Sequence, residues 1–295
     1  MKRREFLKDL AIGSLVWNAG PKLFAQKGGF PDVAVIEGES PSQITKEAVS
    51  SLGGMSRFIS RGDKVLIKPN IGWDRTPEQA ACTNPEVVKT LVELCFEAGA
   101  KEVKVMDNPC NPARRTYVRS GIQKAAKEAG ADVPLPNDHH LKKTPIKGDS
   151  IKEWEVYSDF VETDKIINAP IAKTHSLSRV TLGMKNWLGA IGGNRNQLHQ
   201  NLDLAVVDLA AFFKPVLTVL DAYRILLRNG PQGGRLSDAQ LQKTVVAGVD
   251  YVAIDGLGAT FFGINPAELR FLQLAQKKGH GTFDQEKLRI EKRTL

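Results

Sequence analysis

Short apolar segments rich in Val and Ile recur along this chain, and most of them run directly into a polar residue. They lie at 32–36, 64–67, 102–106, 165–169, 216–220 and 244–248. Segments of this length and composition are typical of strands that are buried on both faces. Because both faces of such strands need a covering layer, this feature restricts the fold more than any other in the sequence.

Helical patterns separate these segments, near 83–99, 115–129, 178–191, 201–212, 250–262 and 266–278. The first is the clearest, since Asn84 can cap a helix that begins at Pro85, and Gly99 ends the pattern. The alternation of strands and helices predicts an α/β fold, a mostly parallel sheet with helices on both faces, in one domain or two closely packed lobes. The stretch at 134–149, rich in Pro, His and Lys, is the expected insertion or lobe boundary.

The first residues are similar to a twin-arginine export signal, in which Arg3 and Arg4 are followed by Phe6, Leu7 and Lys8. The apolar stretch that comes next, 10–17, is shorter than the about 20 residues that a membrane-spanning helix needs. We therefore expect a twin-arginine signal peptide at 1–25 and a single α/β domain at 26–295, which works in the periplasm or elsewhere outside the cytoplasm. The alternatives are a basic amphipathic helix and an uncleaved membrane anchor.

The formal net charge of the 295-residue chain is +8. This mild surplus favours an anionic small molecule or a membrane surface as the partner, and not nucleic acid, because no arginine-rich run interleaved with aromatic residues occurs. Cys82, Cys95 and Cys110 form no Cys-x-x-Cys motif, so we expect no iron–sulfur cluster in this chain. Cys95 falls in a helical apolar pattern and is expected in the core. A disulfide between Cys82 and Cys110 would suit an oxidising compartment.

Polar residues gather where the predicted strands end. Ligands of open parallel sheets bind beyond the carboxyl ends of the strands, so these residues are expected to converge on one site. The candidate ligand-binding residues are Lys68, Asn70, Asn168, Lys173, Thr174, Asn186, Asp221 and Asp250, with Asp107 and Asn108 at a further strand end. For each Asp or Asn taken alone, the alternative is a cap on the following helix.

Lys185 and Asn186 lie in a mostly apolar block, 180–193, that contains four glycines. A buried lysine without a partner is costly, so Lys185 is expected to meet an anionic ligand. The glycines would let the backbone approach such a ligand closely, although their spacing is not that of a phosphate-binding Walker loop. The alternative is a structural ion pair between Lys185 and an aspartate at a strand end.

Two histidines are the most suited to chemistry. His175 and His199 can act as metal ligands or as proton carriers, although a shared site depends on the fold because they are far apart in sequence. We take His175 and Lys185 as the candidate catalytic residues, and His175 with His199 as a candidate metal site. His139 and His140 lie in a polar stretch and are expected to face solvent.

Several of these segments resemble the bacterial and archaeal family known as domain of unknown function 362. The resemblance rests on 67–70, 83–88, 167–170, 173–175, 181–189, 203–208, 230–233 and 247–255. Many relatives carry an iron–sulfur ferredoxin segment, and this chain departs from that pattern. The layout of the strand ends is also similar to that of the lactate racemase family, whose enzymes use a nickel-bearing organic cofactor, which is a likeness of fold and not of chemistry.

Two functions remain open. In the first, the protein is an enzyme in which Lys68, Lys173 and Lys185 hold an anionic small molecule or a metal-containing organic cofactor, while His175 moves a proton or binds metal. Insertion of a cofactor before export would explain a pathway that carries folded proteins. In the second, the same pocket serves a non-catalytic ligand-binding or assembly protein for an exported redox enzyme.

Export by the twin-arginine translocation machinery depends on the arginine pair itself. The double substitution Arg3→Lys and Arg4→Lys should therefore leave the precursor in the cytoplasm, because the receptor of that machinery reads both arginines. Cell fractionation with an antibody against the protein would measure this. Unimpaired export of the double variant would show that the prediction is wrong.

Overall fold

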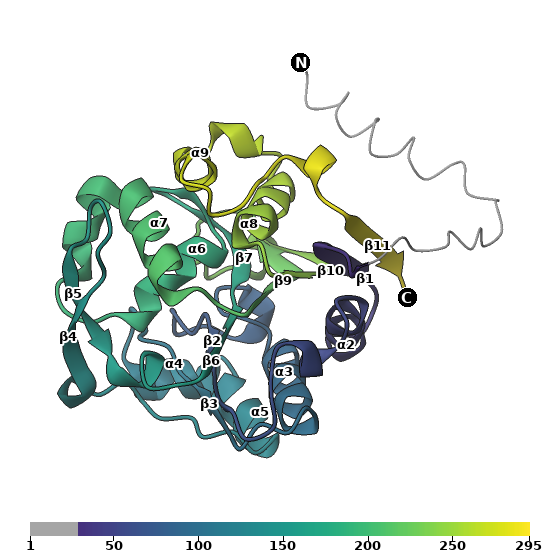
Figure 1. The fold of residues 1–295 in the computed structure, drawn as a ribbon, viewed down its shortest axis with the longest axis horizontal. Coiled ribbons are helices and arrows are strands. Elements are labelled where there is room, and N and C mark those ends of the chain that lie inside the picture. Colours follow the sequence, from purple (N-terminus) through teal and green to yellow (C-terminus); the bar gives the residue numbers. More distant parts are fainter. Residues whose placement is uncertain (1–28) are drawn as a thin grey trace.

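The computed structural model describes residues 29–295 (Figure 1). The predicted export signal at 1–25 lies outside this range. Nine strands form one sheet in the order β11-β1-β10-β9-β6-β2-β3, with β7 beside β9 and β8 beside β7. Their bounds are β1 (Val33–Glu37), β2 (Lys64–Pro69), β3 (Glu102–Val105), β6 (Lys165–Ala169), β7 (Ile171–His175), β8 (Arg179–Thr181), β9 (Leu217–Leu226), β10 (Ala239–Gly248) and β11 (Ile290–Thr294).

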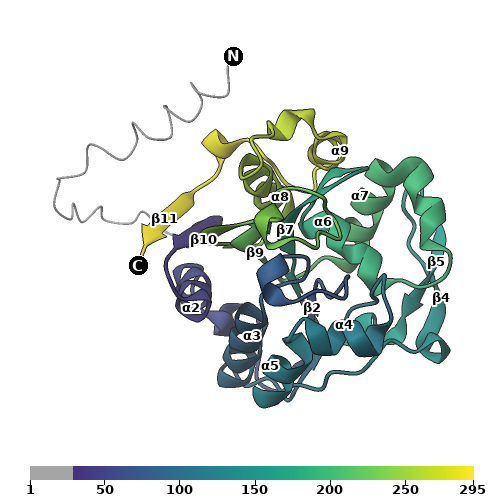
Figure 2. The same ribbon diagram turned by 180° about the vertical axis from the view of Figure 1, so that it is seen from behind.

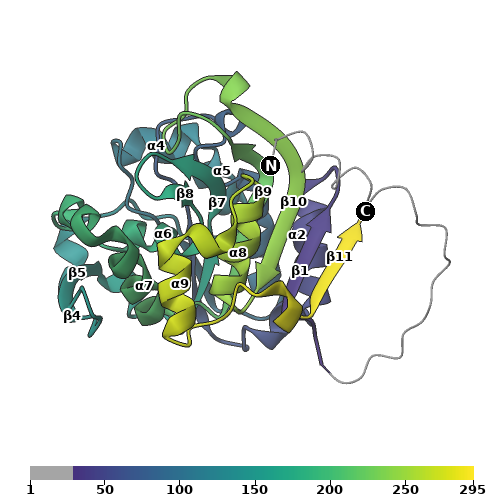
Figure 3. The same ribbon diagram turned by 90° about the horizontal axis from the view of Figure 1, so that it is seen from above.

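Within residues 29–295, eight α-helices cover the sheet in two layers. On one face lie α2 (Pro41–Ser51), α3 (Pro85–Glu97), α4 (Ala113–Arg119) and α5 (Ile122–Glu128), and on the other α6 (Gly183–Asn186), α7 (Leu202–Phe213), α8 (Tyr251–Thr260) and α9 (Arg270–Lys277). Figures 2 and 3 show the strands between these two groups. The side chains of β2 alternate between the layers, with Val65 and Ile67 in one apolar cluster and Leu66 in the other. The predicted α/β class with a mostly parallel sheet is confirmed.

The sheet changes its direction of winding at β2. The chain passes from β2 through α3 to β3 on one side, and then returns to β6 on the other side of β2. After β6 the chain crosses to the opposite face, where α6 and α7 pack. The loops after β2 and β6 therefore diverge to opposite faces, and a crevice opens between the carboxyl ends of these strands. In α/β sheets such a switch point is the usual place for a ligand.

The sheet is less uniform than the sequence pattern predicted. The segments at 216–220 and 244–248 belong to the longer strands β9 and β10, which pair antiparallel with each other. The predicted helix near 178–191 is wrong. In its place are β8, the single turn α6 and a 3₁₀ turn, Trp187–Ala190, since the glycines of this block suit tight turns better than a long helix.

The region around 134–149 leads into a second, two-stranded sheet, whose buried residues join the main core. Two strands outside the main sheet, β4 (Leu141–Pro145) and β5 (Glu153–Tyr157), pair antiparallel. The loop between them is fixed to α7 by one buried carboxylate: Asp208 accepts the backbone N–H groups of Asp149, Ser150 and Ile151 at 3.1, 2.7 and 3.0 Å.

The positions of the cysteines bear on two predictions, the burial of Cys95 and a disulfide between Cys82 and Cys110. Cys95 is fully buried in the core, as predicted. Cys82 is buried whereas Cys110 is exposed, and both are free thiols, so the disulfide between them does not form in this structure. Among residues 29–295, no helix is long and apolar enough to cross a membrane.

Asp208 makes a sharp test of the contact between α7 and the β4–β5 loop. We expect Asp208→Ala to lower the free energy of unfolding by about 3 kcal/mol, because three amides and the Lys278 ammonium lose their acceptor. Chemical denaturation would measure the loss. Asp149→Ala is the matched control: its carboxylate also contacts Lys278 but is exposed, and we expect a change below about 0.5 kcal/mol. Equal effects of the two substitutions would contradict this account.

Candidate functional site

A pocket of about 150 Å³ opens at the switch point between β2 and β6. It brings together nine of the residues selected from the sequence: Lys68, Asn70, Asp107, Asn108, Lys173, His175, Lys185, Asn186 and His199. A cavity of this size accommodates a molecule about as large as benzene. The expected convergence of polar groups at the strand ends is thus a feature of the structure.

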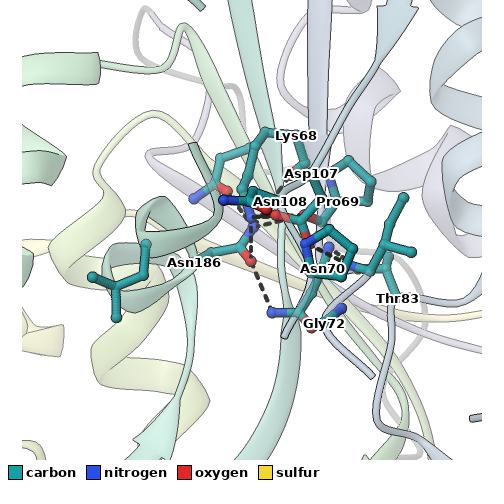
Figure 4. A network of polar contacts seen from close by, with 12 residues as sticks. Lys68, Pro69, Asn70, Gly72, Thr83, Asp107, Asn108 and Asn186 are labelled. Atoms are coloured by element: carbon teal, nitrogen blue, oxygen red, sulfur yellow. Dashed lines mark hydrogen bonds and ion pairs between the residues drawn. The ribbon is translucent and has the colours of Figure 1, made fainter. Parts of the chain in front are cut away.

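Lys68 and Asp107 form a buried ion pair at the base of the pocket. Lys68 Nζ lies 2.7 Å from Asp107 Oδ1, and it also donates to the Pro69 carbonyl at 2.9 Å and to Asn186 Oδ1 at 3.0 Å (Figure 4). Burial lowers the pKa of Lys68, and the Asp107 carboxylate opposes this effect. An ammonium group has three N–H donors. Each has an acceptor here, so Lys68 is a structural cation.

Asn186 connects this ion pair to the neighbouring strands. Its Oδ1 accepts from both Lys68 Nζ and Asn70 Nδ2, and its Nδ2 donates to Asn168 Oδ1 at 2.9 Å. Gly189 allows the turn after α6 to pass directly over the pair, because a Cβ there would lie 1.8 Å from Asp107 Oδ1 and 2.7 Å from Lys68 Nζ. The glycine is therefore needed for close approach, in this case to the ion pair and not to a ligand.

Lys173 is buried without a carboxylate. Its ammonium donates to two neutral oxygens, Asn70 Oδ1 at 2.9 Å and the Ala81 carbonyl at 2.6 Å, and within residues 29–295 it forms no salt bridge. The side chain is 1 % exposed. Burial lowers the pKa of Lys173 to about 8. The pocket therefore contains a cation that no carboxylate of the described residues contacts directly.

Lys185 contacts His175. The two nitrogens, Lys185 Nζ and His175 Nε2, are 2.7 Å apart, while His175 Nδ1 accepts the backbone N–H of Leu177 at 3.0 Å. Burial, reinforced by the charge of Lys173, lowers the pKa of Lys185 to about 7. The alternative of an ion pair between Lys185 and a strand-end aspartate is wrong, since no carboxylate of the described chain pairs with it.

His175 is the last residue of β7, which pairs with β8. Burial lowers the pKa of His175 to about 3, with smaller contributions from the charges of Lys185 and Lys173. The loss of hydration is therefore the main cause of this shift, and the neighbouring charges are secondary.

A buried carboxylate fixes the N-terminus of α6, the one-turn helix that carries Lys185. The Asp255 carboxylate, buried in α8, accepts the N–H groups of Gly183 at 2.6 Å and Met184 at 2.9 Å. These amides would otherwise have no partner at the start of α6. Burial raises the pKa of Asp255 to about 7. Asp255 thus sets the position of Lys185 and Asn186 without lining the pocket.

Four of the candidate ligand-binding residues lie outside the pocket. Asn168 is behind it and bonds to Asn186 and to the Gly183 carbonyl. Thr174 alternates with Lys173 and His175 along β7, so it points away and donates to the Leu226 carbonyl.

The two aspartates have capping roles. Asp221 is not at a strand end but inside β9, where Oδ2 accepts the N–H of Asn84 at 2.7 Å beside the start of α3. Burial raises the pKa of Asp221 to about 6. Asp250 caps α8 through the N–H groups of Val252 and Ala253, and it lies at the far edge of the sheet because β10 runs antiparallel to β9.

The residues at the pocket do not fit a metal held by protein side chains. Both ring nitrogens of His175 are engaged, and His199 Nδ1 faces the Asn196 carbonyl at 3.3 Å. Across residues 29–295, no group of three or more His, Cys, Asp or Glu side chains is placed to hold a metal ion. The candidate metal site at His175 and His199 therefore has no geometric support.

Arg195 is a pocket residue that the sequence did not indicate. Its guanidinium donates to the carbonyls of Asn108, Leu188 and Pro109 at 2.8, 3.0 and 3.0 Å. It lines the pocket and adds a positive charge there. A single arginine in a polar loop carries no signal of this role, because its acceptors are backbone carbonyls that any residue supplies.

The two perturbed lysines make stability depend on pH. In the unfolded chain Lys173 and Lys185 keep the ordinary pKa of 10.5. In the folded protein the pKa is about 8 for Lys173 and about 7 for Lys185. The unfolded chain therefore binds more protons above pH 7, so the free energy of unfolding should rise between pH 7 and pH 9.

Denaturation of wild type and of a Lys173→Met, Lys185→Met double variant at several pH values would measure this contribution. The double variant should lack the part of the rise that the two lysines cause. Parallel pH profiles of the two proteins would contradict the prediction.

Comparison with known proteins agrees with this architecture. The lactate racemase apoprotein from Thermoanaerobacterium thermosaccharolyticum has a similar fold, with a TM-score of 0.50 at 11% sequence identity. The match covers 79% of this chain but only 56% of that one. The thylakoid-associated protein sll1697 of Synechocystis sp. is 26% identical over 236 residues, which are 77% of this chain and 72% of that protein. Residues 65–260 match the model of the domain of unknown function (DUF362), and the chain therefore belongs to the DUF362 family.

Proposed function

We propose that this protein is an enzyme that binds a small anionic molecule in the switch-point pocket, with a carboxylate or phosphate group of the ligand next to Lys173. The observation that carries the proposal is the buried Lys173 ammonium, whose two hydrogen-bond acceptors are both neutral oxygens. A buried charge without a counterion lowers stability, so such a group is expected where a ligand supplies the opposite charge.

The electrostatics of the whole pocket favour the same ligand class. Lys68, Lys173, Lys185 and Arg195 line it, and Asp107 is the single carboxylate that the described residues contribute to the lining. Since Asp107 is already paired with Lys68, the charges of Lys173 and Arg195 are available to an anion. A neutral or cationic ligand would leave those charges unbalanced.

The contact between Lys185 and His175 favours an enzyme over a passive binding protein. A half-buried histidine contacts a buried lysine, and the pKa of that lysine, about 7, lets it take up or release a proton near neutral pH. Among the described residues, the Leu177 and Ser178 amides at His175 Nδ1 are the other hydrogen-bond partners of this pair. Neither side chain has a further partner that would explain a basic group at its position.

We also propose that this chemistry takes place outside the cytoplasm. The proposal rests on the Arg3-Arg4 pair with Phe6, Leu7 and Lys8. Its test is the double arginine substitution described above.

Anion binding can be tested at Lys173. Isothermal titration with inorganic phosphate and with malonate should show that Lys173→Met loses about 2 kcal/mol or more of binding free energy, because the ligand loses one partner of a buried charge pair. Affinity should also fall as the pH rises above about 8, where Lys173 loses its proton. Lys124→Met, at a lysine 83% exposed on α5, is the control and should bind like wild type. If wild type binds neither anion more tightly than Lys173→Met does, the proposal is wrong.

A further inference from the structure

We propose that Lys185 is a nucleophilic amine that forms an imine with a 2-oxo acid bound in the pocket. This inference rests on the proposed anion site at Lys173 and goes beyond it by naming the substrate class and the reacting atom. It is derived from the hydrogen bonds around His175, which determine the protonation state of Lys185.

The backbone decides which nitrogen of His175 carries hydrogen. The N–H of Leu177 points at His175 Nδ1 with a separation of 3.0 Å, and the N–H of Ser178 approaches the same atom at 3.4 Å. A backbone N–H is always a donor, so Nδ1 must be the acceptor and carries no hydrogen. The neutral imidazole then has its hydrogen on Nε2.

Lys185 must accept that hydrogen. Its Nζ lies 2.7 Å from His175 Nε2, and an ammonium group has only donors, so two hydrogens would meet if Lys185 were charged. Only the unprotonated amine has the lone pair that this contact requires. The lowered pKa of Lys185, about 7, agrees with a neutral amine near physiological pH.

An unprotonated lysine amine is the nucleophile that adds to carbonyl compounds. The Nζ lone pair attacks the carbonyl carbon, and the π electrons of the C=O bond move to oxygen, which takes a proton. The nitrogen loses a proton, the C–O bond breaks, and water leaves as the C=N bond forms. A neutral imidazole is too weak an acid to give up its Nε2 hydrogen, so water supplies the second proton to the departing oxygen and takes one from the nitrogen. His175 Nε2–H contacts the reacting nitrogen and keeps it unprotonated and in place.

A 2-oxo acid suits both lysines because its carboxylate is attached directly to the carbonyl carbon. Lys173 and Lys185 line the same pocket, and they are close enough that the charge of Lys173 lowers the pKa of Lys185. Lys173 can thus bind the carboxylate while Lys185 reacts at the adjacent carbon. The volume of about 150 Å³ fits an acid of a few carbon atoms.

Reductive trapping tests the reaction directly. The full chain is incubated at pH 7 with glyoxylate and sodium cyanoborohydride, and the reduced adducts are located by peptide mapping with mass spectrometry. We expect the adduct at Lys185 to form about tenfold or more faster than at exposed Lys124, because a lysine with a lowered pKa is far more often unprotonated. Lys185→Arg should abolish this adduct, since a guanidinium does not form the imine, and it keeps a basic group of similar length.

Acetaldehyde is the matched probe without a carboxylate. Lys185 should react faster with glyoxylate than with acetaldehyde, and Lys173→Met should remove this difference. If phosphate binds through Lys173 but Lys185 is trapped no faster than Lys124, the imine proposal is overturned and the anion site stands. If both aldehydes trap Lys185 rapidly and equally, the amine is the nucleophile but the assignment of a 2-oxo acid is wrong.

Discussion

The buried ion pair between Lys68 and Asp107 is the interaction on which the rest of the site depends. Both side chains are at most 2% exposed, and each charge would be costly to bury without the other. This pair joins the carboxyl ends of β2 and β3. Asn186, in α6, accepts hydrogen bonds from Lys68 and Asn70 and so connects α6 to the same ion pair. Asp107 Oδ2 also accepts the N–H of Ile71, so the loop that follows β2 has one position.

Three lysines in one pocket have three different environments. Lys68 has a carboxylate, Lys173 has two neutral oxygens, and Lys185 has a neutral imidazole. Charge compensation by the protein thus decreases from the base of the pocket toward the residues that remain available to a ligand. A structure selected only for stability would not keep the second and third lysine, because apolar residues of similar volume would remove the cost of burying them.

The position of the pocket follows from topology. Winding reverses at β2, so the helices after β2 and β6 lie on opposite faces, and the strand ends between them stay uncovered. The lactate racemase apoprotein shows that a similar fold occurs in a protein of different sequence. Because many chemistries occur on one fold, the likeness does not transfer an activity, and the residues at the strand ends must decide it.

The sequence by itself determined the α/β class, the family and the strand end that carries Lys68 and Asn70, because burial on both faces leaves a clear apolar pattern that stops where polar residues begin. It did not predict β7, inside which Lys173 lies. The sequence could not distinguish a lysine that is paired inside the protein from one that is available to bind a ligand. Whether Lys68 or Lys185 has a carboxylate partner depends on contacts between residues more than 30 positions apart, which no local pattern records. It also placed Asp250 at the wrong edge, since strand direction is decided only when β10 pairs antiparallel with β9. Only the tertiary structure shows that His175 contacts Lys185. It also decides which ring nitrogen makes this contact, because the backbone N–H of Leu177 bonds to Nδ1 and leaves Nε2 to face the lysine.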